Sequence, residues 1–265
     1  MTARLHDPAE PLAPLFLEGP SAPGLGHART VTFEFQSGGD RVAGRLLLPA
    51  DAARPAPLVL VGHGRGGSKD APYLDSAVGP WVARGAAAAM IDFPLHGSRR
   101  SAKLDEHLLR ARGGAAGGLE GELHAQLARQ AASDLHRAVA VLGAHPAVDA
   151  GRLVYAGFSM GTILGVAFCA DAPAVRAAAL AIGGAGFGPG DTDPARHVGR
   201  FAPRPLLFVQ AERDETIPRS RAEALHAAAG EPKQVLWFDC THGELPGRAL
   251  KAMWTFLAPH LGLAA

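Results

Sequence analysis

The sequence has few of the residues that build metal centres or disulfide frameworks. It holds two cysteines among 265 residues, Cys169 and Cys240, and their separation fits neither a C-x-x-C pair nor a zinc finger. Its twelve histidines include no H-E-x-x-H pattern. We therefore expect two reduced thiols, no metal and no other cofactor.

An excess of charge of one sign is also lacking. The chain has 26 basic and 25 acidic side chains, so its formal net charge is +1. This balance gives no basic footprint for nucleic acid or for an anionic membrane. Small molecules are therefore the expected partners, and the protein is expected to be a monomer or a homodimer.

Long apolar runs are missing as well. Four prolines, together with Asp7 and Glu10, interrupt the first 20 residues, where a secretory signal would need an apolar segment. No stretch of about 20 apolar residues follows that could span a bilayer. The expected location is cytoplasmic.

What the chain does have is a regular alternation of strand-like and helix-like segments. After a proline-rich arm, residues 1–29, two stretches that alternate polar and apolar residues predict a β-hairpin. Uniformly apolar runs follow, as is typical of strands buried on both faces, and helical periodicity separates them. The hairpin strands are expected at 30–35 and 42–48, later strands at 58–61, 86–91, 152–156, 177–182, 205–210 and 234–238, and the last helices at 219–229 and 246–260.

This order predicts one α/β domain, residues 30–265. Repeated strand–helix–strand units indicate a mostly parallel sheet with helices on both faces, preceded by the N-terminal hairpin. The least regular stretches, 98–121 and 183–203, leave the carboxyl ends of strands, where such sheets place their sites. Either stretch is a candidate lid.

One short motif organises the chemistry. Gly157-Phe158-Ser159-Met160-Gly161 has the G-x-S-x-G pattern and lies between a predicted strand and a predicted helix. In this context a sharp strand-to-helix turn exposes the serine hydroxyl, and the flanking glycines avoid collisions with neighbouring elements. Ser159 is the predicted nucleophile.

A serine nucleophile needs a base and a carboxylate that orients the base, in the chain order Ser, Asp or Glu, His. Asp214 follows the strand predicted at 205–210, and His242 follows the last strand. We predict that these two complete a triad, with Glu212 and Glu215 as alternatives to Asp214.

The oxyanion formed during acyl transfer needs two backbone donors, one after the nucleophile and one in the loop after the third strand. Met160 and Arg65 are the predicted donors. The second loop, Gly62–Gly67, also satisfies G-x-G-x-x-G, the fingerprint of dinucleotide binding. That fingerprint must open a helix at once, whereas residues 68–72 intervene here. A phosphate-binding P-loop is excluded because G-K-[ST] is absent.

Together these motifs resemble the α/β-hydrolase superfamily, in particular the compact dienelactone-hydrolase-like serine esterases. The resemblance extends over nearly the whole chain from about Thr30 and also includes Asp92–Ser98, which is similar to a loop common in these hydrolases. True dienelactone hydrolases carry cysteine where Ser159 stands, and the excursion after Ile182 is too short for the helical cap domain of many relatives. The resemblance implies a serine esterase with an open site and no large cap.

We therefore expect a carboxylic-ester hydrolase that acts on short-chain esters through a Ser-His-Asp triad and an acyl-enzyme. A thioesterase, a small-peptide or amide hydrolase, and a ligand-binding receptor on the same fold are the alternatives. Candidate residues for the pocket wall are Leu95, Phe187 and Ile217, which follow three of the predicted strands.

Overall fold

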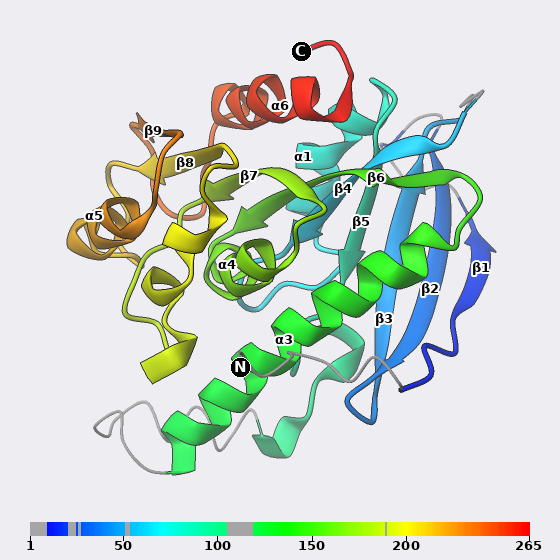
Figure 1. Ribbon diagram of the computed structural model, residues 1–265, viewed down its shortest axis with the longest axis horizontal. Coiled ribbons are helices and arrows are strands. Elements are labelled where there is room, and N and C mark those ends of the chain that lie inside the picture. The colour runs from blue at the N-terminus through cyan, green and yellow to red at the C-terminus, as the bar shows by residue number, and fades with distance from the viewer. Residues whose placement is uncertain (1–9, 21–24, 26–27, 51–53, 105–118, 189) are drawn as a thin grey trace.

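The computed structural model describes residues 10–20, 25, 28–50, 54–104, 119–188 and 190–265 (Figure 1). In this part of the chain, nine strands form one sheet in the order β1-β2-β3-β5-β4-β6-β7-β8-β9. The strands are β1 (Leu15–Gly19), β2 (Arg29–Ser37), β3 (Asp40–Leu48), β4 (Ala56–Gly62), β5 (Ala87–Ile91), β6 (Val148–Phe158), β7 (Val175–Ala181), β8 (Leu206–Ala211) and β9 (Lys233–Phe238). The helices are α1 (Pro72–Val82), α3 (Leu119–Gly143), α4 (Met160–Asp171), α5 (Arg219–Ala228) and α6 (Gly247–Leu261).

The sheet is antiparallel where its first three strands, β1 to β3, pair with one another and with β5, and it is parallel elsewhere. β2 and β3 form the predicted hairpin, closed by Gly38 and Gly39, which both have positive φ angles of 58° and 77°. β3 pairs antiparallel with β5, and the strands from β5 through β4 to β9 run parallel to one another. The predicted fold class, a mostly parallel sheet with an N-terminal hairpin, is confirmed.

Strand β1 was not predicted. It lies inside the segment interpreted as a proline-rich arm, yet it pairs antiparallel with β2 and forms one edge of the sheet. Phe16 is half-buried and packs against Phe33 and His145, whereas Leu15 and Leu17 stay exposed. Prolines at positions 14 and 20 bracket the strand, as an edge strand tolerates. The division into an arm and a domain at residue 30 stays a prediction.

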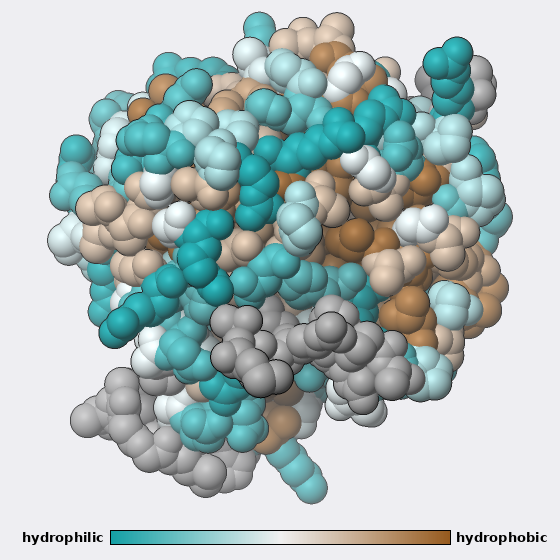
Figure 2. Space-filling view, in the orientation of Figure 1, coloured by the Kyte–Doolittle hydropathy of each residue, from teal (hydrophilic) through white to brown (hydrophobic). Residues whose placement is uncertain are grey.

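Alternating burial on the strands produces two hydrophobic cores. In β4, Leu58 and Leu60 face the core beneath α3, α4 and α5, while Val59 and Val61 face the core beneath α1 and α6. All seven residues of β4 are buried, which explains its uniformly apolar sequence. Helices therefore cover both faces, as expected (Figure 1). Polar and apolar residues are interspersed over the face that carries α3 and α4 (Figure 2).

The excursion after β7 contains three short 3-10 helices, η3 (Gly190–Thr192), η4 (Pro194–Arg196) and η5 (Val198–Phe201). Val198 and Phe201 are buried, and η5 packs against α4. This segment is therefore tied to the body of the domain, and the described residues form no large cap. Most of the other candidate lid, 105–118 of the stretch 98–121, lies outside the described residues. No described helix is both long and apolar enough to cross a membrane.

Candidate active site

Ser159 occupies the sharp turn between β6 and α4. Its φ and ψ angles are 52° and −112°, a conformation that non-glycine residues rarely adopt. The neighbouring chain leaves no room for side chains beside it. A Cβ on Gly157 would lie 2.8 Å from the backbone of Thr162, and one on Gly161 would lie 2.1 Å from the carbonyl oxygen of Gly62. The turn is the predicted elbow, and its geometry exposes the serine.

Two buried hydroxyls brace this turn, and neither was identified from the sequence. The Tyr155 hydroxyl donates to the carbonyl oxygen of Gly161 at 2.6 Å. The Thr162 hydroxyl lies 2.9 Å from the carbonyl oxygen of Gly157 and 2.8 Å from that of Ala181. Complete burial raises the pKa of Tyr155 well above its ordinary value, so its hydroxyl remains a donor. These contacts stabilise the strained turn through the backbone carbonyl groups on both sides of Ser159.

Ser159, His242 and Asp214 form a continuous chain of contacts. The Nε2 atom of His242 lies 2.9 Å from Ser159 Oγ, and its Nδ1 atom lies 2.8 Å from Asp214 Oδ2. Asp214 is itself fixed because its Oδ1 atom accepts the backbone N–H groups of Thr216 and Ile217, at 2.8 and 2.7 Å. The structure thus brings the three residues together in the geometry of a nucleophile, a base and an orienting carboxylate.

The loops that carry Asp214 and His242 are joined beyond the end of the sheet. The backbone N–H of Glu212 donates to Phe238, and that of Arg213 donates to Cys240. Glu215, an alternative candidate for the orienting acid, instead accepts the backbone N–H of His242 at 3.2 Å. Within the described part of the chain, neither Glu212 nor Glu215 forms a hydrogen bond with the His242 imidazole. The geometry therefore favours Asp214 as the orienting acid.

The loop after β4 approaches Ser159 at Gly64. A Cβ on Gly64 would lie 3.6 Å from Ser159 Cβ, which is an ordinary van der Waals distance, so the loop passes directly beside Ser159. The next residue, Arg65, is exposed. Within the described part of the chain, the backbone N–H groups of Arg65 and Met160 donate no hydrogen bond. Met160 is the first residue of α4, where the N–H is free by geometry.

A buried histidine joins this loop to the loop after β5. His63 is fully buried, and its Nε2 atom accepts the backbone N–H of Phe93 at 3.1 Å. Its Nδ1 atom lies 2.8 Å from the carbonyl oxygen of Gly64, so the neutral tautomer with hydrogen on Nδ1 satisfies both contacts. Burial lowers the pKa of His63 to about 4.

Asp92 reinforces the same connection. Its carboxylate is fully buried and accepts the backbone N–H groups of Lys69 and Ser98, at 2.8 and 2.9 Å, as well as the Ser98 hydroxyl at 2.9 Å. The sequence of 92–98 is similar to a loop common in hydrolases, but it gives no signal for this contact with the loop after β4, which joins residues far apart in the chain.

The three predicted pocket residues do not share one environment. Ile217 is 3% exposed, and a Cβ on Gly184 would lie 3.0 Å from its Cγ2 atom. Phe187 is 36% exposed, with the Arg221 guanidinium 4.7 Å from the centre of its ring. Leu95 is half-buried and has a positive φ of 61°. Their part in substrate binding stays a prediction.

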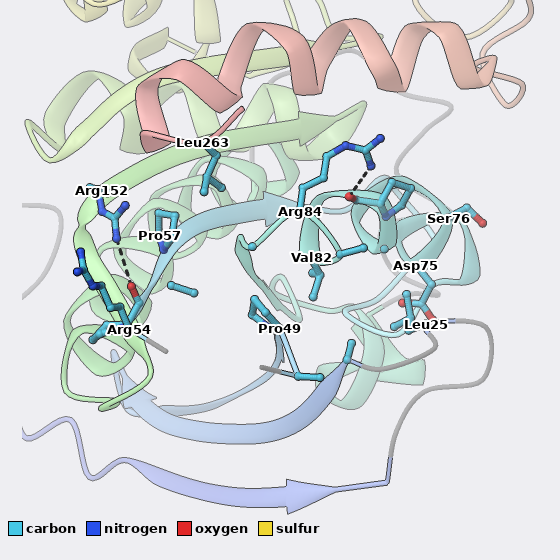
Figure 3. Close-up of a pocket in the computed structure, with 18 residues that line it drawn as sticks. Leu25, Pro49, Arg54, Pro57, Asp75, Ser76, Val82, Arg84, Arg152 and Leu263 are labelled. Carbon is cyan, nitrogen blue, oxygen red and sulfur yellow. Dashed lines mark hydrogen bonds between the residues drawn. The ribbon is translucent and has the colours of Figure 1, made fainter. Parts of the chain in front are cut away.

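A cavity of about 1050 Å³ lies away from this site, near the amino ends of β4 and β6 (Figure 3). Pro57 and Arg152 line it, together with Arg84 and Val82 of the α1 region. The Arg152 guanidinium donates to the carbonyl oxygen of Pro55 at 3.2 Å, and that of Arg84 to Pro80 at 2.8 Å. Since no triad residue lines this cavity, it is not part of the candidate active site.

Within the described residues, no cluster of three or more histidine, cysteine, aspartate or glutamate side chains could hold a metal. Cys169 and Cys240 are both free and buried. Burial raises the pKa of both thiols, which disfavours the reactive thiolate.

The profile of the acetyl xylan esterase family (AXE1) matches residues 25–182, more than half of the chain. The match covers the loop after β4 and the Ser159 turn, and it ends before Asp214 and His242. Among curated proteins, none matches this chain.

Solved structures of similar fold are esterases and related hydrolases. An acetyl xylan esterase from Paenibacillus sp. R4 has a TM-score of 0.74 and 20% identity, over 94% of this chain and 89% of its own. Acetyl xylan esterase 1 from Thermoanaerobacterium sp. JW/SL YS485 has a TM-score of 0.69 and 17% identity, over 92% of this chain and 87% of its own. A Klebsiella pneumoniae protein provisionally named a dienelactone hydrolase has a TM-score of 0.66 and 18% identity, over 94% of this chain and 99% of its own. The fold of this chain is therefore the α/β-hydrolase fold that the sequence predicted.

Proposed function

Because the chain belongs to the acetyl xylan esterase family, and is thus a hydrolase of carboxylic esters, we propose that it cleaves short-chain esters, acetyl esters above all. Ser159, His242 and Asp214 carry the reaction. The observation that supports this most directly is the unbroken contact chain from Ser159 Oγ through the His242 imidazole to the Asp214 carboxylate.

The first half of the reaction acylates the enzyme. His242 Nε2 removes the proton from Ser159 Oγ while the oxygen attacks the ester carbonyl carbon. The negative charge that develops on the carbonyl oxygen is stabilised by the N–H groups of Met160 and Arg65. His242 then gives its proton to the leaving alcohol, and the acyl group remains on Ser159.

The second half releases the acid. Water replaces the alcohol, His242 takes a proton from it, and the resulting hydroxide attacks the acyl-enzyme carbonyl. When the second tetrahedral intermediate collapses, His242 returns the proton to Ser159 Oγ and the carboxylic acid leaves. Asp214 holds the imidazole in one orientation and stabilises its charged form through both halves.

The preference for short acyl groups rests on the absence of a large cap among the described residues. Each CH₂ group that stays in water forgoes about 0.8 kcal/mol of burial, so an uncovered site gains nothing from a long acyl chain. Two of the solved structures with a similar fold are acetyl xylan esterases, which agrees with acetyl as the acyl group.

A comparison of leaving groups tests the proposal. Acetate release is measured from an acetylated xylo-oligosaccharide, nitrophenyl acetate, an acetyl thioester and an acetyl anilide. We expect the highest kcat/KM for the two oxygen esters and negligible turnover of the anilide. A kcat/KM for the thioester or the anilide above that for both esters would contradict the proposal and favour a thioesterase or an amidase.

A further inference from the structure

Gly64 is held by hydrogen bonds on both sides of its Cα atom. Its backbone N–H donates to the hydroxyl oxygen of Tyr73 at 2.6 Å. Its carbonyl oxygen accepts the backbone N–H of Gly67 at 3.1 Å and lies 2.8 Å from Nδ1 of His63. A glycine is otherwise the residue whose backbone rotates most freely, so these external contacts decide its conformation.

The two contacts act on two different peptide planes. The Gly64 N–H belongs to the plane shared with His63, whereas the Gly64 carbonyl belongs to the plane shared with Arg65. A trans peptide is rigid, and its N–H points opposite to its C=O. Fixing the Gly64 carbonyl therefore fixes the direction of the Arg65 N–H, and fixing the Gly64 N–H prevents rotation of the plane before it.

Tyr73 is well placed for this role. It is the second residue of α1, and its ring packs edge-on against Phe158, the residue before the nucleophile, with ring centres 5.9 Å apart. A Cβ on Gly64 would lie 3.5 Å from the Tyr73 hydroxyl and 3.6 Å from Ser159 Cβ. The hydroxyl and the nucleophile thus flank the same point of the loop. Although Tyr73 as a whole is 42% exposed, its hydroxyl end lies against the Gly64 loop, and this partial burial raises the pKa of Tyr73. The hydroxyl therefore stays neutral.

We propose that Tyr73, together with His63, is a positioning residue of the oxyanion hole: the pair fixes the peptide planes on either side of Gly64 and aims the Arg65 N–H at the ester oxygen. This inference rests on the proposed ester hydrolysis. It gives the exposed tyrosine at the start of α1 a part in the reaction without direct contact with the reacting atoms.

The variant Tyr73→Phe removes the hydroxyl and keeps the ring. Since complete loss of an oxyanion donor costs about 10²- to 10³-fold in kcat, a loosened donor should cost about 10- to 100-fold. We expect kcat for nitrophenyl acetate to fall by that factor, with KM changed less than about threefold. Affinity for phenylboronic acid, which forms a tetrahedral adduct with the serine, should fall by a similar factor.

Tyr155→Phe is the matched control. The Tyr155 hydroxyl also forms a hydrogen bond with the backbone of a glycine near Ser159, but this glycine is Gly161 of the β6–α4 turn and not part of the loop that carries Arg65. We expect this change to lower the melting temperature more than Tyr73→Phe does, and to weaken phenylboronic acid less. Equal losses of boronic acid affinity in the two variants would indicate general loosening of the site and would overturn the proposal.

Hydrogen exchange of the Gly64 amide, measured by NMR on glycine-labelled protein, gives a readout that needs no activity. In Tyr73→Phe the Gly64 amide should exchange at least about tenfold faster. Unchanged exchange, or a kcat and boronic acid affinity within twofold of the wild type, would contradict the role of Tyr73. Absence of ester turnover in the wild type would instead refute the proposed function, with the exchange rate still reporting whether Tyr73 holds Gly64.

Discussion

His63 Nε2 accepts the backbone N–H of Phe93 at 3.1 Å, and one buried neutral imidazole thereby joins two loops that lie 30 residues apart in the chain. A protonated imidazole would lose this acceptor and would place a charge in a site from which water is excluded. Burial accordingly lowers the pKa of His63 to about 4. The loop that carries Arg65 therefore depends on a histidine that must stay uncharged.

The first prediction concerns stability in acid. In the unfolded chain histidine titrates near pH 6.5, so between about pH 6.5 and 4 the unfolded state binds a proton that folded His63 does not. The free energy of unfolding should fall as the pH drops through this window, and His63 should have no such effect above it. His226, whose pKa burial also lowers to about 4, acts in the same direction.

Urea unfolding of the wild type and of His63→Phe at pH 7 and pH 5 isolates the contribution of His63. Between these two pH values the variant should lose about 2 kcal/mol less stability than the wild type, although it is less stable overall at pH 7. Equal losses in the two proteins would show that His63 titrates normally when folded.

The second prediction concerns the oxyanion donors. Arg65→Pro removes the backbone N–H, whereas Arg65→Ala removes only the exposed side chain. We expect the proline variant to lose about 10²- to 10³-fold in kcat and the alanine variant to stay within about threefold on neutral esters. Circular dichroism is the control that tests whether both variants fold. A proline variant with normal kcat would exclude the Arg65 amide from the oxyanion hole.

The third prediction separates the two acids beside His242. Asp214→Asn should lower kcat by about 10⁴-fold, because the amide favours the wrong tautomer of the imidazole. Glu215→Gln keeps an oxygen that can accept the His242 backbone N–H, so kcat should change less than about threefold. A larger loss in Glu215→Gln than in Asp214→Asn would exchange the roles of the two residues.

Much of this architecture was predictable because it depends on local patterns. Uniformly apolar runs marked strands such as β4, and the contrast with the alternating hairpin distinguished the parallel part of the sheet from the antiparallel part. The glycines around Ser159 marked the elbow because only residues without a Cβ fit there. Chain order then selected Asp214 and His242 from many acids and histidines. Their catalytic roles stay predictions, supported by the contacts now described.

Other features had no local signal. Strand β1 lies among prolines, and what reveals it is its pairing with β2, a contact between distant segments. Tyr73 looks like an ordinary surface residue of a helix, and only its contact with Gly64 reveals a role. Tyr155 reads as one more core residue of a strand, although its hydroxyl braces the elbow. The pocket candidates differ in exposure for the same reason, since side-chain direction in loops depends on packing, and their part in binding stays a prediction.

The fourth prediction concerns the length of the acyl chain. If no lid covers the site, kcat/KM should be highest between acetyl and hexanoyl esters and should not rise further, since added CH₂ groups gain no burial. The measurement is a series of nitrophenyl esters from two to sixteen carbons, kept below the micelle concentration of the longer members. A maximum at twelve carbons or more would indicate a lipase-like lid.

The central claim is that Ser159 is the nucleophile of a triad with His242 and Asp214. It is tested most directly by the kinetics of Ser159→Ala, His242→Ala and the double variant on nitrophenyl acetate. Because triad members act as a unit, each single change should lower kcat by about 10⁴- to 10⁶-fold, and the double change should add little. Near-normal esterase activity in Ser159→Ala would contradict the account.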